Sequence, residues 1–520
     1  MSVVSEAAAE RRFRRLAGLP REVDPRLSWW RRKTVGPQLW VVLAATVVFA
    51  IGLTWQYREV SRSVMAEIKA YTEQIGNPTE LTISQFNEAL HGAMFNFSAQ
   101  LHPFQLHPGA LWTVTFYVLV FLLLDRWRPT TPSMKYVALG WGAACATLIA
   151  LYVNTWASDL SNVIGPVDPT SSARAAIFIA PFVEEACKAT VVFLLAVAVR
   201  YRLVSSLQMV ALAGLSGVGF AFTENLIYYV RQYVYAVKIF GNDPVADLNQ
   251  LMWLRGVATS FGHPLFTSMT AVGVIVALHS ASRVVRIVAP LVGYLVAATL
   301  HMTFNGFSST SSDPSIVIVG GLMLVILGLA WLWRQSARQR TLISWRLDDY
   351  VRMGWLKPSD PRIFDRLTVR FKLAFAALLR GPRVYKATVT LIADITELAY
   401  LRAAMVDALV DAPGLVRERE LLIDIRALRG LALDDPAGLR VKPDTWHPIT
   451  RLKTWWGVSR PRWWPAREAA PGYVSPAPLP SGVYAATPSG WPPAPAAPRP
   501  PAPVGVAPAA PPYGGPPRRV

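Results

Sequence analysis

Residues 175–199 read AAIFIAPFVEEACKATVVFLLAVAV, a run long and apolar enough to cross a bilayer that nevertheless contains Glu184, Glu185 and Lys188. A spanning helix needs about 20 mostly apolar residues. Seven further runs of this kind occur at about 38–56, 108–125, 136–156, 206–229, 256–279, 287–307 and 315–333. The sequence therefore predicts an all-α polytopic membrane protein with about eight transmembrane helices.

The composition of the 520 residues agrees with this prediction, because 52% are hydrophobic and only 16% are charged, whereas soluble domains carry about 25% charged residues. The net charge of +19 comes from basic residues that mostly lie between the apolar runs. Nucleic-acid binding requires a basic patch on a folded soluble domain, so we expect no nucleic-acid partner. The two cysteines, Cys145 and Cys187, both lie in apolar runs, which excludes a disulfide framework.

The Lys and Arg residues between the runs are unevenly divided, with sixteen on the side of the N-terminus and seven on the other side. Basic residues accumulate on the cytoplasmic side of membrane proteins. With eight spans, this bias predicts that both termini are cytoplasmic in a multi-pass protein of the cell membrane.

Composition also divides the chain into segments. A basic cytoplasmic segment (1–37) precedes the transmembrane domain (38–334), which includes an extracytoplasmic loop (57–107). A charged cytoplasmic extension with helical periodicity (335–460) follows. The tail (461–520) contains 19 of the 41 prolines, so we expect it to be disordered and regard it as a candidate for binding a cytoplasmic partner.

Apart from Asp125, the last residue of its run, the ionisable residues within the predicted spans are few: three carboxylates (Glu184, Glu185 and Glu224) and one basic residue well inside a span, Lys188. Each costs roughly 2.5–3.5 kcal/mol near the centre of a spanning helix, so we expect them to face one another or a wet cavity. The spacing permits this, because Lys188 follows the first two acids by four and three residues and therefore shares one helix side with them.

The next spans carry further polar groups. His263 lies in the sixth span, and His301 and Asn305 lie one turn apart on one face of the seventh. Pro181, just before the acidic turn, removes a backbone hydrogen bond and favours a kink there. Close helix approach is expected at Gly214, Gly217 and Gly219 of the fifth span.

These groups could hydrolyse an amide bond. A buried carboxylate can act as a general base on water and then as a general acid on the leaving amine, while imidazole and amide N–H groups can bind an oxyanion. Structural roles are alternatives at each position: the Glu–Lys pairs could tie helices together, each histidine could only hydrogen-bond, and Glu224 could only position water.

Four motifs resemble those of PrsW-type intramembrane proteases, a family related to the CAAX prenyl proteases and bacteriocin-processing enzymes. They are Glu184-Glu185-x-x-Lys188, Phe220-x-x-x-Glu224-Asn225, His263, and His301-x-x-x-Asn305. The resemblance covers about residues 105–335. In the CAAX branch the first motif ends in Arg and the second contributes a His, so Lys188 and Glu224 favour the PrsW branch.

The resemblance implies an intramembrane endopeptidase that cleaves single-span, membrane-anchored proteins in the lipid bilayer, in the best-known case a bacterial anti-sigma factor by site-1-type cleavage. It implies that Glu184 activates water and that Glu185 and Lys188 support it. By the same comparison His263, His301 and Asn305 bind the water or the oxyanion, and Glu224 is the second-motif acid. No cofactor is expected.

Two other functions fit some of these residues. Glu184, His263 and His301 could bind zinc in a metalloprotease, although the sequence has no His-Glu-x-x-His helix. Buried Glu, Lys and His residues also occur in proton-coupled transporters, although no pair of interrupted spans suggests an inverted repeat. An inactive scaffold that binds through its cytoplasmic parts is a third alternative.

Overall fold

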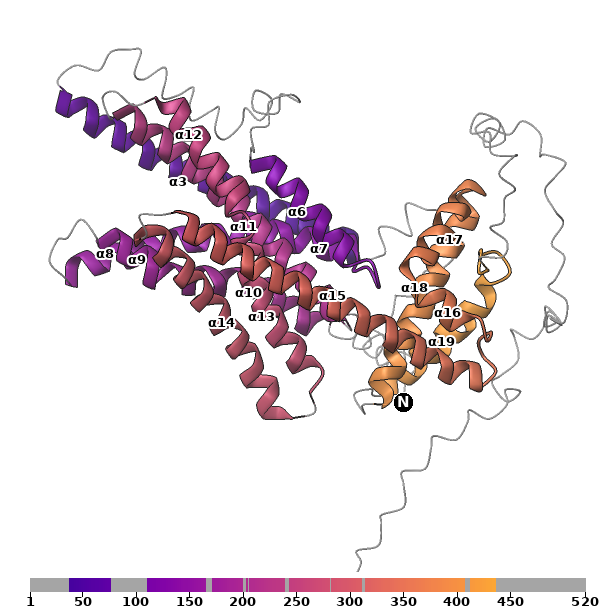
Figure 1. Ribbon diagram of the computed structural model, residues 1–520. Helices are drawn as coiled ribbons and strands as arrows, with labels where there is room; N and C mark the ends of the chain where they lie inside the picture. Colours follow the sequence, from indigo (N-terminus) through magenta and orange to yellow (C-terminus); the bar gives the residue numbers. More distant parts are fainter. Residues whose placement is uncertain are drawn as a thin grey trace, which may run out of the picture. The chain divides into compact units, whose positions relative to one another are not determined.

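The computed structural model describes residues 37–75, 110–164, 171–199, 203, 205–238, 243–280, 282–310, 314–406 and 412–435. All regular secondary structure in these ranges is helical (Figure 1). Residues 1–36, most of the predicted loop (76–109) and the proline-rich tail (461–520) lie outside the described ranges.

The membrane domain begins with α3 (Pro37–Ile75), α6 (Ala110–Leu124), α7 (Pro132–Gly140), the π-helical turn η1 (Trp141–Ala146) and α8 (Thr147–Ile164). It continues with α9 (Ser171–Phe178), α10 (Ala180–Ala198), α11 (Ser206–Lys238), α12 (Pro244–Trp253), the π-helical turn η3 (Leu254–Ala258), α13 (Gly262–Leu278), α14 (Arg283–Thr310) and α15 (Pro314–Arg352).

Within the described ranges, six helical runs are long and apolar enough to cross a membrane: Gln38–Ala66, Pro132–Leu160, Ser206–Tyr233, Val245–Leu278, Arg283–Thr310 and Ser315–Arg352. Each overlaps one predicted span. The other two predicted spans correspond to α6, which has only 15 residues, and to α10, whose 19 residues include three ionisable ones. The multi-pass all-helical architecture is confirmed, while the number of eight spans and the orientation of the termini stay predictions.

The helix boundaries differ from the apolar runs. α3 extends to Ile75, so the first part of the predicted loop 57–107 is helical. The helical run containing the sixth span starts at Pro244 rather than at residue 256. Hydropathy shows which part of a helix is apolar. It does not show where the helix itself begins or ends, because backbone hydrogen bonds continue into polar sequence. Near the acidic turn, α9 and α10 are separated at Ile179, and Pro181 occupies the first turn of α10.

α11 is the most enclosed helix of the domain, with most of its apolar length buried. Two of the predicted glycines explain how closely it is packed. A Cβ on Gly219 would lie 2.0 Å from the carbonyl oxygen of Leu139 in α7, and a Cβ on Gly217 would lie 2.7 Å from that of His263 in α13. The predicted close approach is thus confirmed, and it brings the part of α11 that carries Glu224 next to α13.

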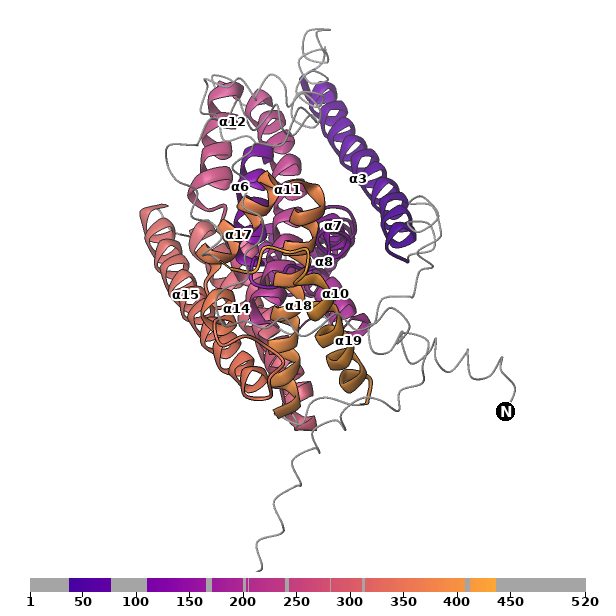
Figure 2. The same ribbon diagram turned by 90° about the vertical axis from the view of Figure 1, so that its right-hand side faces the viewer.

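α3 and α15 lie at the periphery, on opposite sides of α11 (Figure 2). Only a small part of the apolar length of each is buried by other parts of the protein. Their exposed Leu, Val and Trp side chains, such as Trp40 and Leu327, suit contact with lipid.

The extension contains α16 (Asp360–Phe364), α17 (Leu367–Leu379), α18 (Pro382–Val406) and α19 (Ala412–Leu428), in orange in Figure 1. α15 continues past its apolar part to Arg352 and packs against α16 and α18. Glycines at positive φ, Gly354 (77°) and Gly381 (112°), make the turns before α16 and α18. The buried core formed here also takes in Trp127 and Leu207 of the membrane domain.

Candidate active site

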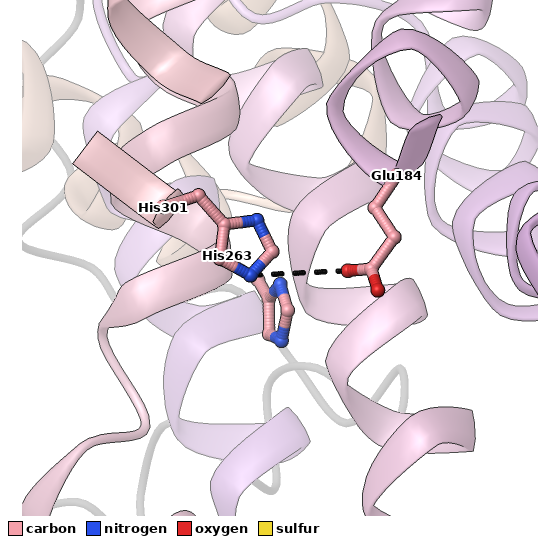
Figure 3. Close-up of side chains that lie close together, drawn as sticks. All are labelled: Glu184, His263 and His301. Atoms are coloured by element: carbon pink, nitrogen blue, oxygen red, sulfur yellow. Dashed lines mark ion pairs between the residues drawn. The ribbon is translucent and has the colours of Figure 1, made fainter. Parts of the chain in front are cut away.

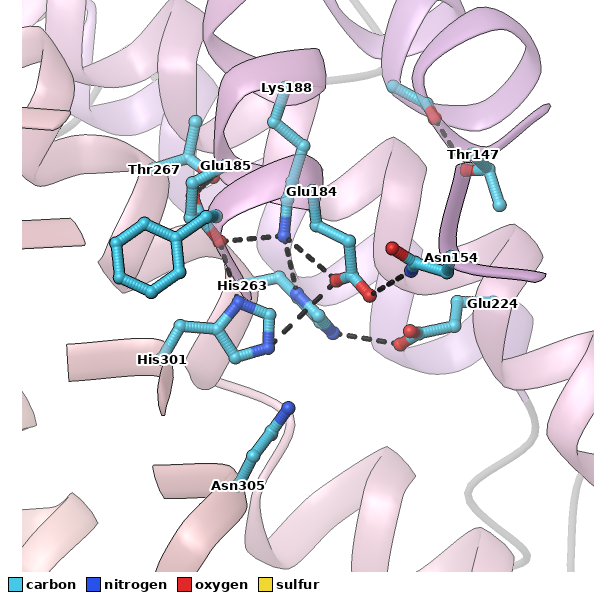
Figure 4. Close-up of polar contacts among 12 residues, drawn as sticks. Thr147, Asn154, Glu184, Glu185, Lys188, Glu224, His263, Thr267, His301 and Asn305 are labelled. Atoms are coloured by element: carbon cyan, nitrogen blue, oxygen red, sulfur yellow. Dashed lines mark hydrogen bonds and ion pairs between the residues drawn. The ribbon is translucent and has the colours of Figure 1, made fainter. Parts of the chain in front are cut away.

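The acidic turn of α10 is almost completely buried, and its charges are paired as the spacing predicted. The Lys188 Nζ lies 2.7 Å from Glu185 Oε1 and 3.6 Å from Glu184 Oε2 (Figure 4). It also lies 4.2 Å from the centre of the Phe220 ring. The ammonium ion is therefore held between two carboxylates and an aromatic face, which compensates its burial.

Glu185 has partners on both oxygens. Its Oε1 contacts Lys188 and His301 Nδ1 (3.0 Å), and its Oε2 accepts a hydrogen bond from Thr267 Oγ1 (2.9 Å). The residue has no exposed surface. Its carboxylate therefore fixes the positions of Lys188 and His301.

Glu184 differs from its neighbour because it lines a cavity of about 360 Å³. Its Oε1 accepts a hydrogen bond from Asn154 Nδ2 in α8 (3.3 Å). Its Oε2 is buried but accepts no hydrogen bond, and it lies 3.9 Å from His301 Nε2 (Figure 3). Buried oxygens of this kind normally have a partner, so this atom is suited to bind water or another ligand.

The tautomers of the two histidines follow from their partners. His301 Nδ1 donates to Glu185, which leaves Nε2 as an acceptor on the side of Glu184. His263 Nδ1 lies 2.8 Å from Lys188 Nζ and its Nε2 lies 2.9 Å from Glu224 Oε2. Because an ammonium group can only donate, Nδ1 accepts and Nε2–H donates to Glu224. His301 is further fixed by stacking on Phe266, with ring centroids 5.2 Å apart.

Glu224 is held by a residue that the sequence analysis did not place in the site. Arg255, in η3, lies with Nη2 2.5 Å from Glu224 Oε2 and donates from Nε to Asn225 Oδ1 (2.8 Å). Its guanidinium lies over the ring of Tyr228, 3.9 Å from the centroid. Lys188 is therefore not the only basic residue of the polar cluster. Arg255 lies one residue before the apolar run that begins at about 256, whereas the helical segment that leads to it already begins at Pro244.

Asn305 lines the cavity as well but has a separate partner. Its Nδ2 donates to the carbonyl oxygen of Ala176 in α9 (3.0 Å). It lies away from the carboxylates in Figure 4. Asn154 and Thr267 were also missed, because a single amide or hydroxyl in an apolar helix has no spacing that distinguishes it.

The cluster also has the composition of a metal site. Glu184, His263 and His301 each offer one ligand atom, and these atoms lie within 4.8 Å of one another. One carboxylate and two imidazoles fit a catalytic zinc centre, and the His301–Glu185 contact resembles the second-shell carboxylate of such centres. The residue types therefore fit, but both ring nitrogens of His263 already have partners, one of which the metal would replace.

Residues 130–332 match the family model described as PrsW family intramembrane metalloprotease. Over these residues, the predicted resemblance to the PrsW family is confirmed. The match contains every predicted site residue together with Asn154 and Arg255, and it ends before the extension. PrsW proteins are intramembrane proteases, so the match favours a peptidase and gives no support to the transporter alternative. No curated protein and no solved structure matches the chain significantly.

Proposed function

We propose that this PrsW-type protein is an endopeptidase of the cell membrane in which Glu184 activates the water that attacks the peptide bond. The observation that carries this proposal is the buried Oε2 of Glu184, which accepts no hydrogen bond and belongs to a side chain lining the cavity. Glu185 is unsuited to the same role, because both of its oxygens have partners.

The water would lie between Glu184 Oε2 and His301 Nε2, which are 3.9 Å apart. Both atoms are acceptors, so each would take one hydrogen of the water and leave its lone pairs for the substrate carbonyl carbon. Attack transfers one water proton to Glu184, which then protonates the leaving amine. Lys188 stabilises the carboxylate in the ground state at 3.6 Å.

The oxyanion of the tetrahedral intermediate needs N–H donors. His263 Nε2–H and the Asn305 amide belong to side chains that line the same cavity, where they now donate to Glu224 and to Ala176. We propose that one or both turn to the oxyanion when substrate binds. Such a donor contributes about 2.7–4 kcal/mol to transition-state stabilisation in other proteases.

The cavity is built by helices of the membrane domain, α8 to α11, α13 and α14 among them. The substrate class that suits this place is a single-span membrane protein. Cleavage of an anti-sigma factor in bacterial signalling is a more specific form of the proposal and rests on the family resemblance alone.

A second candidate is zinc-dependent hydrolysis, which the 4.8 Å cluster and the description of the family as metalloproteases favour. Glu184, His263 and His301 would hold the ion, which would polarise the substrate carbonyl and acidify a bound water. Against it stands the Lys188 ammonium, 2.8 Å from His263 Nδ1, because a cation at that place repels a divalent metal.

The test uses the purified full-length protein in nanodiscs and a panel of single-span reporters in water enriched in heavy oxygen. Hydrolysis by activated water inserts one oxygen atom from solvent into the new carboxylate, which mass spectrometry detects. We expect cleavage to continue after chelation, with metal loss verified by elemental analysis. Loss of cleavage on chelation and recovery with zinc would establish the second candidate, and wild-type protein inactive on every reporter would contradict both.

A further inference from the structure

α17 presents an apolar stripe on its uncovered side. Phe371, Phe375, Leu378 and Leu379 recur at helical spacing and are exposed by 72%, 48%, 50% and 43%. The two phenylalanine rings stack with centroids 6.3 Å apart. The opposite side of the helix, with Leu373 and Ala377, is buried in the core of the extension. α17 is therefore apolar on two faces, and one of them is not covered by the described part of the chain.

The stretch of sequence that contains this stripe, between Asp365 and Asp394, is basic. Residues 366–393 contain six Lys or Arg residues and no Asp or Glu. Five of the six are exposed: Arg366, Lys372, Arg380, Arg383 and Lys386. A helix with exposed Phe and Leu beside a basic margin has the composition of an element that lies in the membrane interface.

α17 is also placed next to a point where the chain leaves the membrane domain. Arg370 Nη1 donates to the carbonyl oxygen of Trp127 (3.0 Å), and its guanidinium lies 5.2 Å from the centre of the Trp127 ring. Trp127 follows the end of the apolar helix α6, at Leu124, by only three residues. Phe371, the first residue of the stripe, is adjacent to Arg370 in the sequence.

We propose that α17 docks on anionic lipids of the leaflet at which α6 ends, which the charge bias predicts to be the cytoplasmic one. The apolar stripe enters the boundary between headgroups and acyl chains, and Lys372, Arg383 and Lys386 bind lipid phosphates. Anionic lipid matches both halves of this surface, the apolar stripe and the uniformly basic margin. A protein partner would have to match the same pattern while reaching a helix beside the bilayer. The proposal is independent of the chemistry at Glu184.

The test uses the full chain in nanodiscs with a fluorophore on Phe375→Cys and nitroxide quenchers on the lipid headgroups. The matched control is Leu415→Cys in α19, an apolar position of the extension that is exposed by 59% and followed by two Arg and two Glu residues, Arg417-Glu418-Arg419-Glu420. The chain without an added cysteine corrects for labelling of Cys145 and Cys187.

We expect quenching at position 375 in nanodiscs containing anionic lipid, and little at position 415. Lys372→Gln with Arg383→Gln should weaken docking, because each basic residue near an anionic surface changes the equilibrium by about fivefold. Equal quenching at both positions, or quenching at 375 that is unchanged in purely zwitterionic lipid, would overturn the proposal. The proposal would also be overturned if the fluorescence at position 375 changed only when a protein was added, a result that would identify a protein partner instead.

Discussion

Replacement of Lys188 by Met tests the electrostatics of the acidic turn. Methionine fills nearly the same volume but removes the ammonium ion that lies 2.7 Å from Glu185 and 3.6 Å from Glu184. Both carboxylates are buried, with exposed fractions of 0% and 5%. Removing one partner of a buried ion pair typically costs about 3–5 kcal/mol, since the remaining charge is uncompensated. We expect a loss of this size in the free energy of unfolding.

The double variant Lys188→Met with Glu185→Gln separates pairing from packing. If the loss arises from the uncompensated charge, neutralising Glu185 should restore part of the stability that Lys188→Met removes. Residues in direct contact show coupling energies of about 0.5–3 kcal/mol in double-mutant cycles, and this buried pair belongs in the upper half of that range. Cleavage should be low in Lys188→Met and also in the double variant, because Glu184 and His263 lose the ammonium ion in both proteins.

The assay is unfolding of the purified protein in mild detergent for the wild type, the two single variants and the double variant, followed by fluorescence, with reporter cleavage measured on the same samples. A Lys188→Met protein as stable as the wild type would refute the reasoning. So would stability losses that simply add in the double variant.

Three further predictions concern other parts of the chain. Arg255→Gln should clearly lower kcat but change the melting temperature only slightly, because Arg255 positions Glu224. Reporter kinetics and melting curves of the same samples check this. Gly219→Ala should destabilise the protein by about 1–3 kcal/mol, since the new Cβ would lie 2.0 Å from the Leu139 carbonyl oxygen; an unchanged melting temperature would contradict it. In the extension, burial raises the pKa of Asp394 from 3.8 to about 7. The folded state therefore binds the proton more tightly, and stability should fall as the pH rises from about 4 to 7, by at most about 4 kcal/mol; Asp394→Asn should flatten this dependence in melting curves.

The sequence was sufficient for those parts of the site that depend on local spacing. Glu184, Glu185 and Lys188 share one helical turn, so their contact requires only that α10 be a helix. Their burial in an apolar run also implied that polar groups from other spans would meet them. His263 and His301 do so, at 2.8 Å from Lys188 and 3.0 Å from Glu185.

The remaining features depend on how the helices pack, which spacing does not reveal. Asn154 reaches Glu184 because α8 lies beside α10, and Asn305 is turned to Ala176 because α9 is a separate short helix. Arg255 was misplaced for a different reason: hydropathy detects the start of the apolar run but not the ten-residue helix α12 that precedes η3.

The most direct test of the central claim is the single-turnover cleavage rate of Glu184→Gln in nanodiscs, with Glu418→Gln in the extension as the matched control. Glutamine retains the shape of the side chain and can still accept from Asn154, but it cannot take a proton from water. General-base catalysis contributes typically 10²–10⁴-fold, so we predict a rate at least about a hundredfold below that of the wild type, with an unchanged melting temperature and full activity in the control. A folded Glu184→Gln protein that cleaves at the wild-type rate would contradict the account.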